Sequence, residues 1–159
     1  MGTTEEGRPG PGRRRLLIVE DSRTHRRNLR DALARDYELH WATNARDALA
    51  LAFTKRPDLI LLDVNIDPPP GEELDGVGDP VPGRNISGLE VCRQLKRGIL
   101  KDTPIVVLTA QRGFLPRIRG KFAHANEYLT KPIETEALQG TIRKYLEDPR
   151  PAPEPRIRA

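Results

Sequence analysis

The chain has 159 residues, which suits a single domain, and its one cysteine excludes a disulfide framework or a cysteine-rich metal site. No apolar run is long enough to span a bilayer, and residues 1–15 lack the apolar stretch of a signal peptide, so we expect a cytoplasmic protein without a membrane partner. The net charge of +4 comes largely from arginines near the two ends, a pattern that does not favour nucleic-acid binding.

Hydrophobic residues make up only 36% of the chain, and the deficit is concentrated in three segments. Glycine, proline, arginine and glutamate dominate the two ends, and residues 67–85 contain five of the 15 prolines. Such segments bury too little apolar surface to offset the entropy lost on ordering. We therefore predict a flexible basic tail over residues 1–14, one domain over 15–147 that includes 67–85 as an inserted loop, and a flexible tail over 148–159.

Strands and helices are predicted to alternate along the domain. The predicted strands are Leu16–Val19, Tyr37–Ala42, Leu59–Asp63, Ile105–Leu108 and Glu127–Thr130. The predicted helices run from a cap at Asp21 or Ser22 to about Arg35, from Ala45 to Phe53, from Gly88 (capped by Ser87) to Arg97, from Arg112 to Ala123, and from Thr135 to Leu146. This alternation predicts a doubly wound α/β fold with five parallel strands and five helices, and a long insertion between the third strand and the third helix.

Three of the helices have a recognisable apolar side. Cys92 shares helical spacing with Leu89 and Leu95, so we expect a small buried residue rather than a nucleophile. The expected buried face of the second helix consists of Ala45, Ala48, Leu49, Ala52 and Phe53. That of the last helix consists of Ala137, Leu138, Thr141, Ile142, Tyr145 and Leu146.

Four predicted strands end in, or lead directly into, residues that could bind ions or phosphate. The first leads into Glu20 and Asp21, the third ends in Asp63, the fourth leads into Thr109, and the fifth leads into Lys131. Strands that are apolar throughout are buried on both faces, as in a parallel sheet covered by helices. Because sites of such sheets lie beyond the carboxyl ends of the strands, we expect all five side chains at one edge.

This combination of groups favours phosphoryl chemistry. Two carboxylates about 4 Å apart repel by about 4 kcal/mol at an effective dielectric near 20, unless a cation lies between them. Mg²⁺ suits such a site because it binds a few carboxylates and keeps waters that a phosphate can replace. A strand-end carboxylate could then act as a nucleophile and form an aspartyl-phosphate, with Lys131 and Thr109 contacting the phosphoryl oxygens.

Each of these residues also has an ordinary structural explanation. An acidic pair after a strand often caps a helix, an aspartate at a strand end often forms a turn, and a threonine or lysine there means little alone. Their occurrence together, in strand order and at one edge, is what favours the phosphoryl site.

The sequence resembles the receiver domains of two-component response regulators, which have the CheY-like, flavodoxin-like fold. The resemblance spans about residues 15–147 and rests on five stretches: Leu17–Ser22, Leu61–Asn65, Ser87–Val91, Val107–Ala110 and Tyr128–Pro132. A second, weaker similarity, over Arg112–Lys121, is to receivers of the twitching-motility and type IV pilus group. An exposed basic helix would explain that segment equally well.

The resemblance implies a role for each matching residue. Asp63 would accept a phosphoryl group from the phosphohistidine of a histidine kinase or phosphotransfer protein. Asp21, Asp63 and the backbone carbonyl of Asn65 would hold Mg²⁺, with Glu20, which replaces a more usual aspartate, acting partly through water. Thr109 and Lys131 would sense the phosphate, Tyr128 would change rotamer as the readout, and the bond before Pro132 would be cis. Asn65 and Gln111 occupy positions that tune dephosphorylation in the family.

The inserted residues 67–85 depart from the family pattern, and the three histidines have no role that the pattern assigns. The 19 residues from Asp67 to Asn85 replace a connection of a few residues and could affect kinase docking or dephosphorylation, or could form a solvated loop pointing away. His25 and His40 have no partners at metal-ligand spacing in the sequence, and His124 is expected at the surface.

The sequence thus predicts a single-domain response regulator, a phosphorylation switch rather than an enzyme, with only intrinsic self-phosphorylation and self-dephosphorylation. Its 13 residues after Leu146 are too few for an output domain, so we expect signalling to an unidentified protein target, with phosphorylation-dependent homodimerisation possible. Three alternatives remain: a degenerate receiver that acts as a constitutive interaction module, a receiver fragment of a longer regulator, and an aspartyl-phosphate phosphatase. Asn65 weighs against the last, which usually needs a second acid there.

Overall fold

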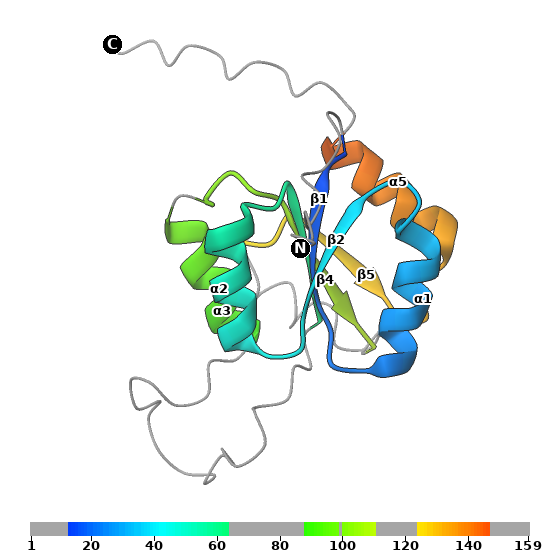
Figure 1. Cartoon of the computed structure of the whole chain (residues 1–159), viewed down its shortest axis with the longest axis horizontal. Helices are drawn as coiled ribbons and strands as arrows, with labels where there is room; N and C mark the ends of the chain where they lie inside the picture. Colours follow the sequence, from blue (N-terminus) through cyan, green and yellow to red (C-terminus); the bar gives the residue numbers. More distant parts are fainter. Residues whose placement is uncertain (1–12, 64–87, 99, 111–123, 147–159) are drawn as a thin grey trace, which may run out of the picture.

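The computed structural model describes residues 13–63, 88–98, 100–110 and 124–146. In these ranges, five strands form one parallel sheet in the order β2-β1-β3-β4-β5. Helices cover both of its faces, with α2 and α3 on one side and α1 and α5 on the other (Figure 1). The predicted doubly wound α/β fold is therefore confirmed.

The strands lie where the apolar runs predict them. They are β1 (Arg15–Val19), β2 (Glu38–Ala42), β3 (Leu59–Asp63), β4 (Ile105–Thr109) and β5 (Glu127–Thr130). Every residue of β3 and β4 is buried, but all four residues of β5 are only partly buried. The partial burial of β5 follows from its place at the edge of the sheet, where among the described residues it pairs with a strand on one side alone.

Four helices are described: α1 (Arg23–Leu33), α2 (Ala45–Lys55), α3 (Gly88–Arg97) and α5 (Thr135–Leu146). The expected fourth helix, over Arg112–Ala123, lies outside the described residues, and so do Ser87 and the insertion at 67–85. The first helix ends at Leu33, slightly before the predicted end at Arg35. Among the described helices, none is long and apolar enough to cross a membrane.

Two hydrophobic cores lie on opposite faces of the sheet because neighbouring residues of a strand point to opposite sides. Leu17 and Val19 of β1 pack with α2 and α3, in a cluster that contains the buried Cys92, as predicted. Leu16 and Ile18 pack on the other side with α1 and α5. This strict division specifies the register of β1, since a shift by one residue would exchange the two faces.

The helix faces follow the prediction with two exceptions. In α2, Ala45, Ala48 and Ala52 are buried, but Phe53 is 43% exposed because it lies at the margin of the face that the alanines define. In α5, Leu138, Ile142 and Leu146 are buried, whereas Ala137 is exposed. In both helices the sequence predicted too wide a buried face.

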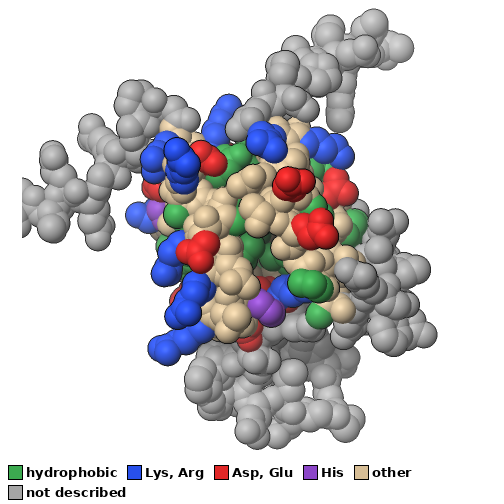
Figure 2. Space-filling view, turned by 90° about the vertical axis from the view of Figure 1, so that its right-hand side faces the viewer, with side chains coloured by type: hydrophobic (Ala, Val, Ile, Leu, Met, Phe, Trp, Pro, Cys, Tyr) green, Lys and Arg blue, Asp and Glu red, His purple; other side chains and the backbone are tan. Residues whose placement is uncertain are grey.

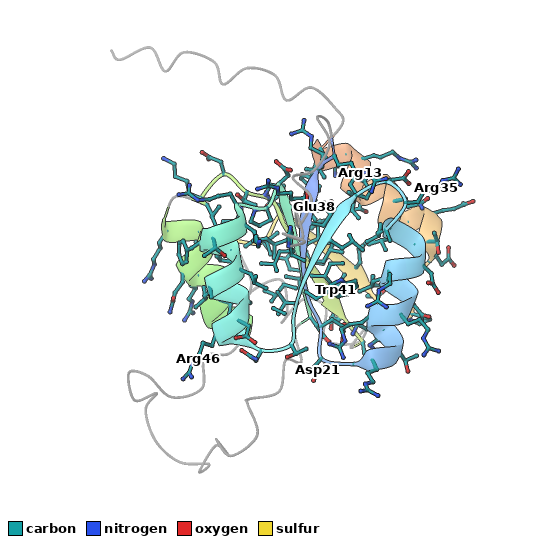
Figure 3. All side chains as sticks on the ribbon, in the orientation of Figure 1. Arg13, Asp21, Arg35, Glu38, Trp41 and Arg46 are labelled. Atoms are coloured by element: carbon teal, nitrogen blue, oxygen red, sulfur yellow. The ribbon has the colours of Figure 1, made fainter. Side chains whose placement is uncertain are left out.

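Capping interactions are present at the start of α1 and at both ends of α2. Ser22 is the N-cap of α1, and its hydroxyl accepts a hydrogen bond from the backbone N–H of His25 at 3.4 Å. Asn44 caps α2 through the N–H of Asp47 at 2.9 Å, and α2 ends at Arg56 in the left-handed conformation, with φ of 49°. Trp41 of β2 points toward the α1 side, where the guanidinium of Arg30 lies 5.6 Å from its ring centroid (Figure 3).

Candidate phosphoryl-acceptor site

Three polar side chains are buried in the described part of the chain, and all three lie at carboxyl ends of strands. Glu20 follows β1, Asp63 ends β3 and Thr109 ends β4, and each has at most 3% of its surface exposed. The strand ends are aligned by register, with Asp63 opposite Leu108 and Thr109 opposite Thr130. Burial of polar groups is costly, so their concentration at one edge marks this edge as the candidate site.

Lys131 brings its charge into the same place. The residue follows β5, and its backbone N–H donates to the carbonyl oxygen of Thr109 at 2.7 Å. Its ammonium donates to Oε2 of Glu20 at 2.8 Å and to Oδ2 of Asp63 at 3.0 Å. The structure therefore brings together four of the strand-end residues predicted from the sequence.

A fifth residue at this site was missed by the sequence reasoning. Nδ1 of His25 lies 3.0 Å from the Lys131 ammonium and 3.5 Å from Oε1 of Glu20. One potential ligand atom each from Glu20, His25 and Asp63 forms a group whose members all lie within 4.8 Å of one another. The sequence reasoning found no partner for His25 at metal-ligand spacing, whereas in the structure the start of α1 brings its ring beside Glu20 and Asp63.

The charges at the site perturb two ionisable groups. Burial raises the pKa of Glu20, and the neighbouring Asp63 carboxylate adds to this, against the opposing effect of Lys131. Burial alone would lower the pKa of Lys131, but its hydrogen bonds to Glu20 and Asp63 outweigh that cost and raise the pKa above its usual value. Two carboxylates thus share a single ammonium, which compensates them only in part.

Other predicted site residues lie nearby or outside the described ranges. Asp21 lies in the loop after β1 (Figure 3) but does not belong to the close group of ligand atoms. Tyr128 is half-buried and packs against the core on the α2 and α3 side. The Lys131–Pro132 bond is cis, as the resemblance implied. Asn65 and Gln111 fall outside the described residues.

A cavity of about 530 Å³ extends from the site along α1 and the start of α5. Figure 2 looks onto this face of the molecule, where basic side chains gather along one side. Arg23, Arg27 and Arg30 of α1 are exposed. The cavity has a polar end at the buried Glu20 and an apolar wall, and its lining includes Glu20, His25, Asp31, Lys131, Ile133 and Leu138.

The donor set fits a hard divalent cation. The carboxylates of Glu20 and Asp63 are buried and lie close together, and they supply the oxygen ligands that Mg²⁺ prefers. Their shared ammonium leaves negative charge uncompensated, which favours a cation at this edge.

Comparison with known proteins agrees with this geometry. Residues 16–75 match the family model described as the response regulator receiver domain. Response regulator MprA of Mycolicibacterium vanbaalenii is 37% identical over 133 residues, which cover 83% of this chain and 50% of MprA. The chain therefore spans about half the length of the curated relatives it matches.

Solved structures show the same fold. A protein from Chloroflexus aurantiacus described as a response regulator is 30% identical, with a TM-score of 0.68 over 86% of this chain and 99% of its own. The receiver domain of sensor histidine kinase PA1611 from Pseudomonas aeruginosa PAO1, with a magnesium ion coordinated in its active-site cleft, is 22% identical, with a TM-score of 0.66 over 84% of this chain and 98% of its own. The chain accordingly belongs to the response regulator receiver domain family.

Proposed function

We propose that this domain is a phosphorylation switch whose acceptor is Asp63. The observation that carries the proposal is the meeting of Glu20, Asp63 and Lys131 at the carboxyl end of the sheet, with Thr109 buried at the end of the next strand. A buried carboxylate beside an ammonium and a hydroxyl suits phosphoryl transfer, because these donors can stabilise the charge that develops on the transferred oxygens.

In the proposed reaction, the phosphorus of a phosphohistidine on a kinase or phosphotransfer protein is the electrophile. A carboxylate oxygen of Asp63 forms the new bond to phosphorus while the bond from phosphorus to the imidazole nitrogen breaks, and the released imidazole keeps the electron pair. Lys131 then exchanges one carboxylate contact for a phosphoryl oxygen, and the Thr109 hydroxyl donates to another. The later hydrolysis of the aspartyl-phosphate by water returns inorganic phosphate.

We infer that Mg²⁺ is the cofactor of this reaction. Asp21, Asp63 and the backbone carbonyl of Asn65 would hold the ion, with Glu20 acting partly through water. When bound, the ion supplies charge neutralisation between the carboxylates and the incoming phosphoryl group. The donor chemistry of Glu20 and Asp63 and the magnesium ion of the related PA1611 receiver support this choice.

The readout is proposed to be a protein contact on the surface that includes β5 and α5. Phosphorylation adds close to two negative charges at Asp63 and would draw Thr109 and Lys131 toward it. Lys131 follows β5 directly, and Tyr128 on the same strand is half-buried, so a movement of either would change that surface. Because this chain covers only about half the length of its curated relatives, an effector within a longer regulator and a separate target protein both fit the proposal.

The test is the intact mass of the protein after incubation with acetyl phosphate and Mg²⁺. We expect the wild type to gain one phosphoryl group and Asp63→Asn to gain none. Asp36→Asn, at an exposed turn remote from the site, is the matched control and should gain one group. A folded wild-type protein that gains no phosphoryl group and also does not bind beryllofluoride would contradict the switch and favour a constitutive interaction module.

Light scattering of the beryllofluoride-treated protein would then test for a phosphorylation-dependent homodimer. A doubling of mass on treatment would support self-association as the readout. An unchanged monomer would leave contact with a different protein as the proposed readout.

A further inference from the structure

The position of His25 is determined by the start of α1. Ser22 is the N-cap, and its backbone N–H donates to Oε1 of Glu20 at 3.2 Å, while its hydroxyl accepts from the backbone N–H of His25. These contacts place His25 on the first turn of α1, directly above the buried end of β1. The ring is therefore positioned over the site by backbone geometry, and with 46% of its side chain exposed it also borders solvent.

The nitrogen of His25 that faces the site is available as a ligand. Nδ1 lies 3.0 Å from the ammonium of Lys131, which can only donate. As the acceptor from Lys131, Nδ1 presents its lone pair to the site and the ring proton is on Nε2; the alternative partner of Nδ1, Oε1 of Glu20, is farther away, at 3.5 Å. Histidine bound to a metal ion through one nitrogen has this arrangement.

Three acceptor atoms surround the ammonium of Lys131. The Lys131 ammonium contacts Oε2 of Glu20 at 2.8 Å, Oδ2 of Asp63 at 3.0 Å and Nδ1 of His25 at 3.0 Å. The ammonium thus marks a position at which one positive charge is already bound by two carboxylates and an imidazole. Two negative charges surround one positive charge there, so a dication matches the site better than the ammonium does.

We propose that His25 is a metal ligand and that, with Glu20 and Asp63, it gives this acceptor site a preference for transition-metal dications such as Zn²⁺ over Mg²⁺. An imidazole nitrogen favours Zn²⁺, Co²⁺ or Ni²⁺, whereas sites of oxygen ligands alone suit Mg²⁺. The inference rests on the proposed function because both ions share Asp63. It differs from the proposed Mg²⁺ set of Asp21, Asp63 and Asn65 in that the ion takes the place of the Lys131 ammonium and uses Glu20 and His25 instead.

The geometry requires only a small adjustment. The three ligand atoms lie within 4.8 Å of one another. Donor atoms bound to one tetrahedral Zn²⁺ at about 2.1 Å are about 3.4 Å apart, so a movement of about 1 Å by each side chain would bring them together. Lys131 must leave its shared position when the ion enters, and it has a flexible four-carbon stem that allows this.

The experiment compares Zn²⁺ and Mg²⁺ affinities, measured by competition with a chromogenic indicator, for the wild type, His25→Gln and His124→Gln. His124 is an exposed histidine and serves as the matched control. We expect one Zn²⁺ per wild-type chain and a ratio of Zn²⁺ to Mg²⁺ affinity that falls at least about tenfold in His25→Gln. Replacement of a residue that only hydrogen-bonds to a metal ligand already lowers metal affinity about tenfold or more, so loss of a ligand should cost at least as much. His124→Gln should keep the wild-type ratio.

A spectroscopic measurement identifies the ligand directly. The proton spectrum of the Co²⁺-loaded wild type should contain one paramagnetically shifted, exchangeable signal from the Nε2–H of His25, and His25→Gln should lack it. An unchanged affinity ratio in His25→Gln, or an equal loss in His124→Gln, would overturn the proposal. Phosphoryl incorporation into the wild type with acetyl phosphate and Mg²⁺ separates this failure from failure of the proposed function, since it does not depend on Zn²⁺ binding.

Discussion

The ammonium of Lys131 lies 3.0 Å from Oδ2 of Asp63, although the two residues are 68 positions apart in the chain. One follows the edge strand β5 and the other ends the central strand β3, so the contact exists only when β3, β4 and β5 are assembled in order. The strength of the contact comes from burial, because the side chain of Lys131 is 12% exposed and that of Asp63 is 5% exposed.

Replacement of Lys131 should therefore be strongly destabilising in the absence of metal. Lys131→Ala leaves Glu20 and Asp63 buried without their shared ammonium, and losing one partner of a buried pair costs about 3–5 kcal/mol. We expect a loss of this size in the free energy of unfolding measured with urea, and partial recovery when Mg²⁺ is added.

The matched control is Lys144→Ala. Lys144 pairs with Glu127 at 3.1 Å, but its side chain is 61% exposed. Exposed pairs contribute about 0–1 kcal/mol, so the control should change stability little. Equal effects of the two replacements would show that the Lys131 contacts do not stabilise the fold.

Replacement of Glu20 should have the opposite sign. Burial raises the pKa of Glu20, which means that keeping this group ionised near neutral pH costs folding free energy. Glu20→Gln removes the charge while keeping one oxygen acceptor, which can serve either Lys131 or the backbone N–H of Ser22. We expect a metal-free gain in the free energy of unfolding on the order of 1 kcal/mol, with weaker Mg²⁺ binding by calorimetry. A less stable variant in metal-free buffer would argue that the ionised carboxylate stabilises the fold.

The thiol of Cys92 provides a probe of the core beside α3. Burial raises its pKa, while Lys96 and Arg93 oppose the shift. The protein should therefore keep the stability linked to this group below pH 9.0, its ordinary value, and lose it as the pH rises through the higher folded-state pKa. We expect alkylation at pH 8 to be at least about 100-fold slower in buffer than in urea, because the native thiol reacts only after opening. Comparable rates in the two solvents would mean that the core around α3 is open.

The end of α2 offers a stabilising change. Arg56 has a positive φ of 49°, a conformation that glycine adopts without cost and other residues do not. Arg56→Gly should raise the free energy of unfolding by about 0.5–1 kcal/mol, less the loss of the bond from Nε of Arg56 to the carbonyl oxygen of Phe53 at 3.2 Å. Arg56→Ala isolates that loss, because it removes the side chain and keeps the strain. A glycine variant no more stable than the alanine variant would contradict the strain argument.

The sequence alone predicted the alternation of strands and helices along the chain and the polar residues that lie at the carboxyl ends of the strands. Apolar runs of four or five residues, each closed by a polar residue, located the buried strands and predicted Glu20, Asp63, Thr109 and Lys131 at one edge. This prediction succeeds because parallel strands buried on both faces leave a strong local signal and because all their carboxyl ends meet at the same edge.

Only the tertiary structure decided which of these side chains touch and how exposed the strands are. The partial burial of β5 follows from its place at the sheet edge, and the exposure of Phe53 follows from the narrow contact of α2 with the sheet. The position of His25 above Glu20 depends on how α1 leaves β1, a geometry fixed by the Ser22 cap and by packing against α5. Residue periodicity records which side of an element is apolar, but distances between side chains arise from the packing of elements that are remote in sequence.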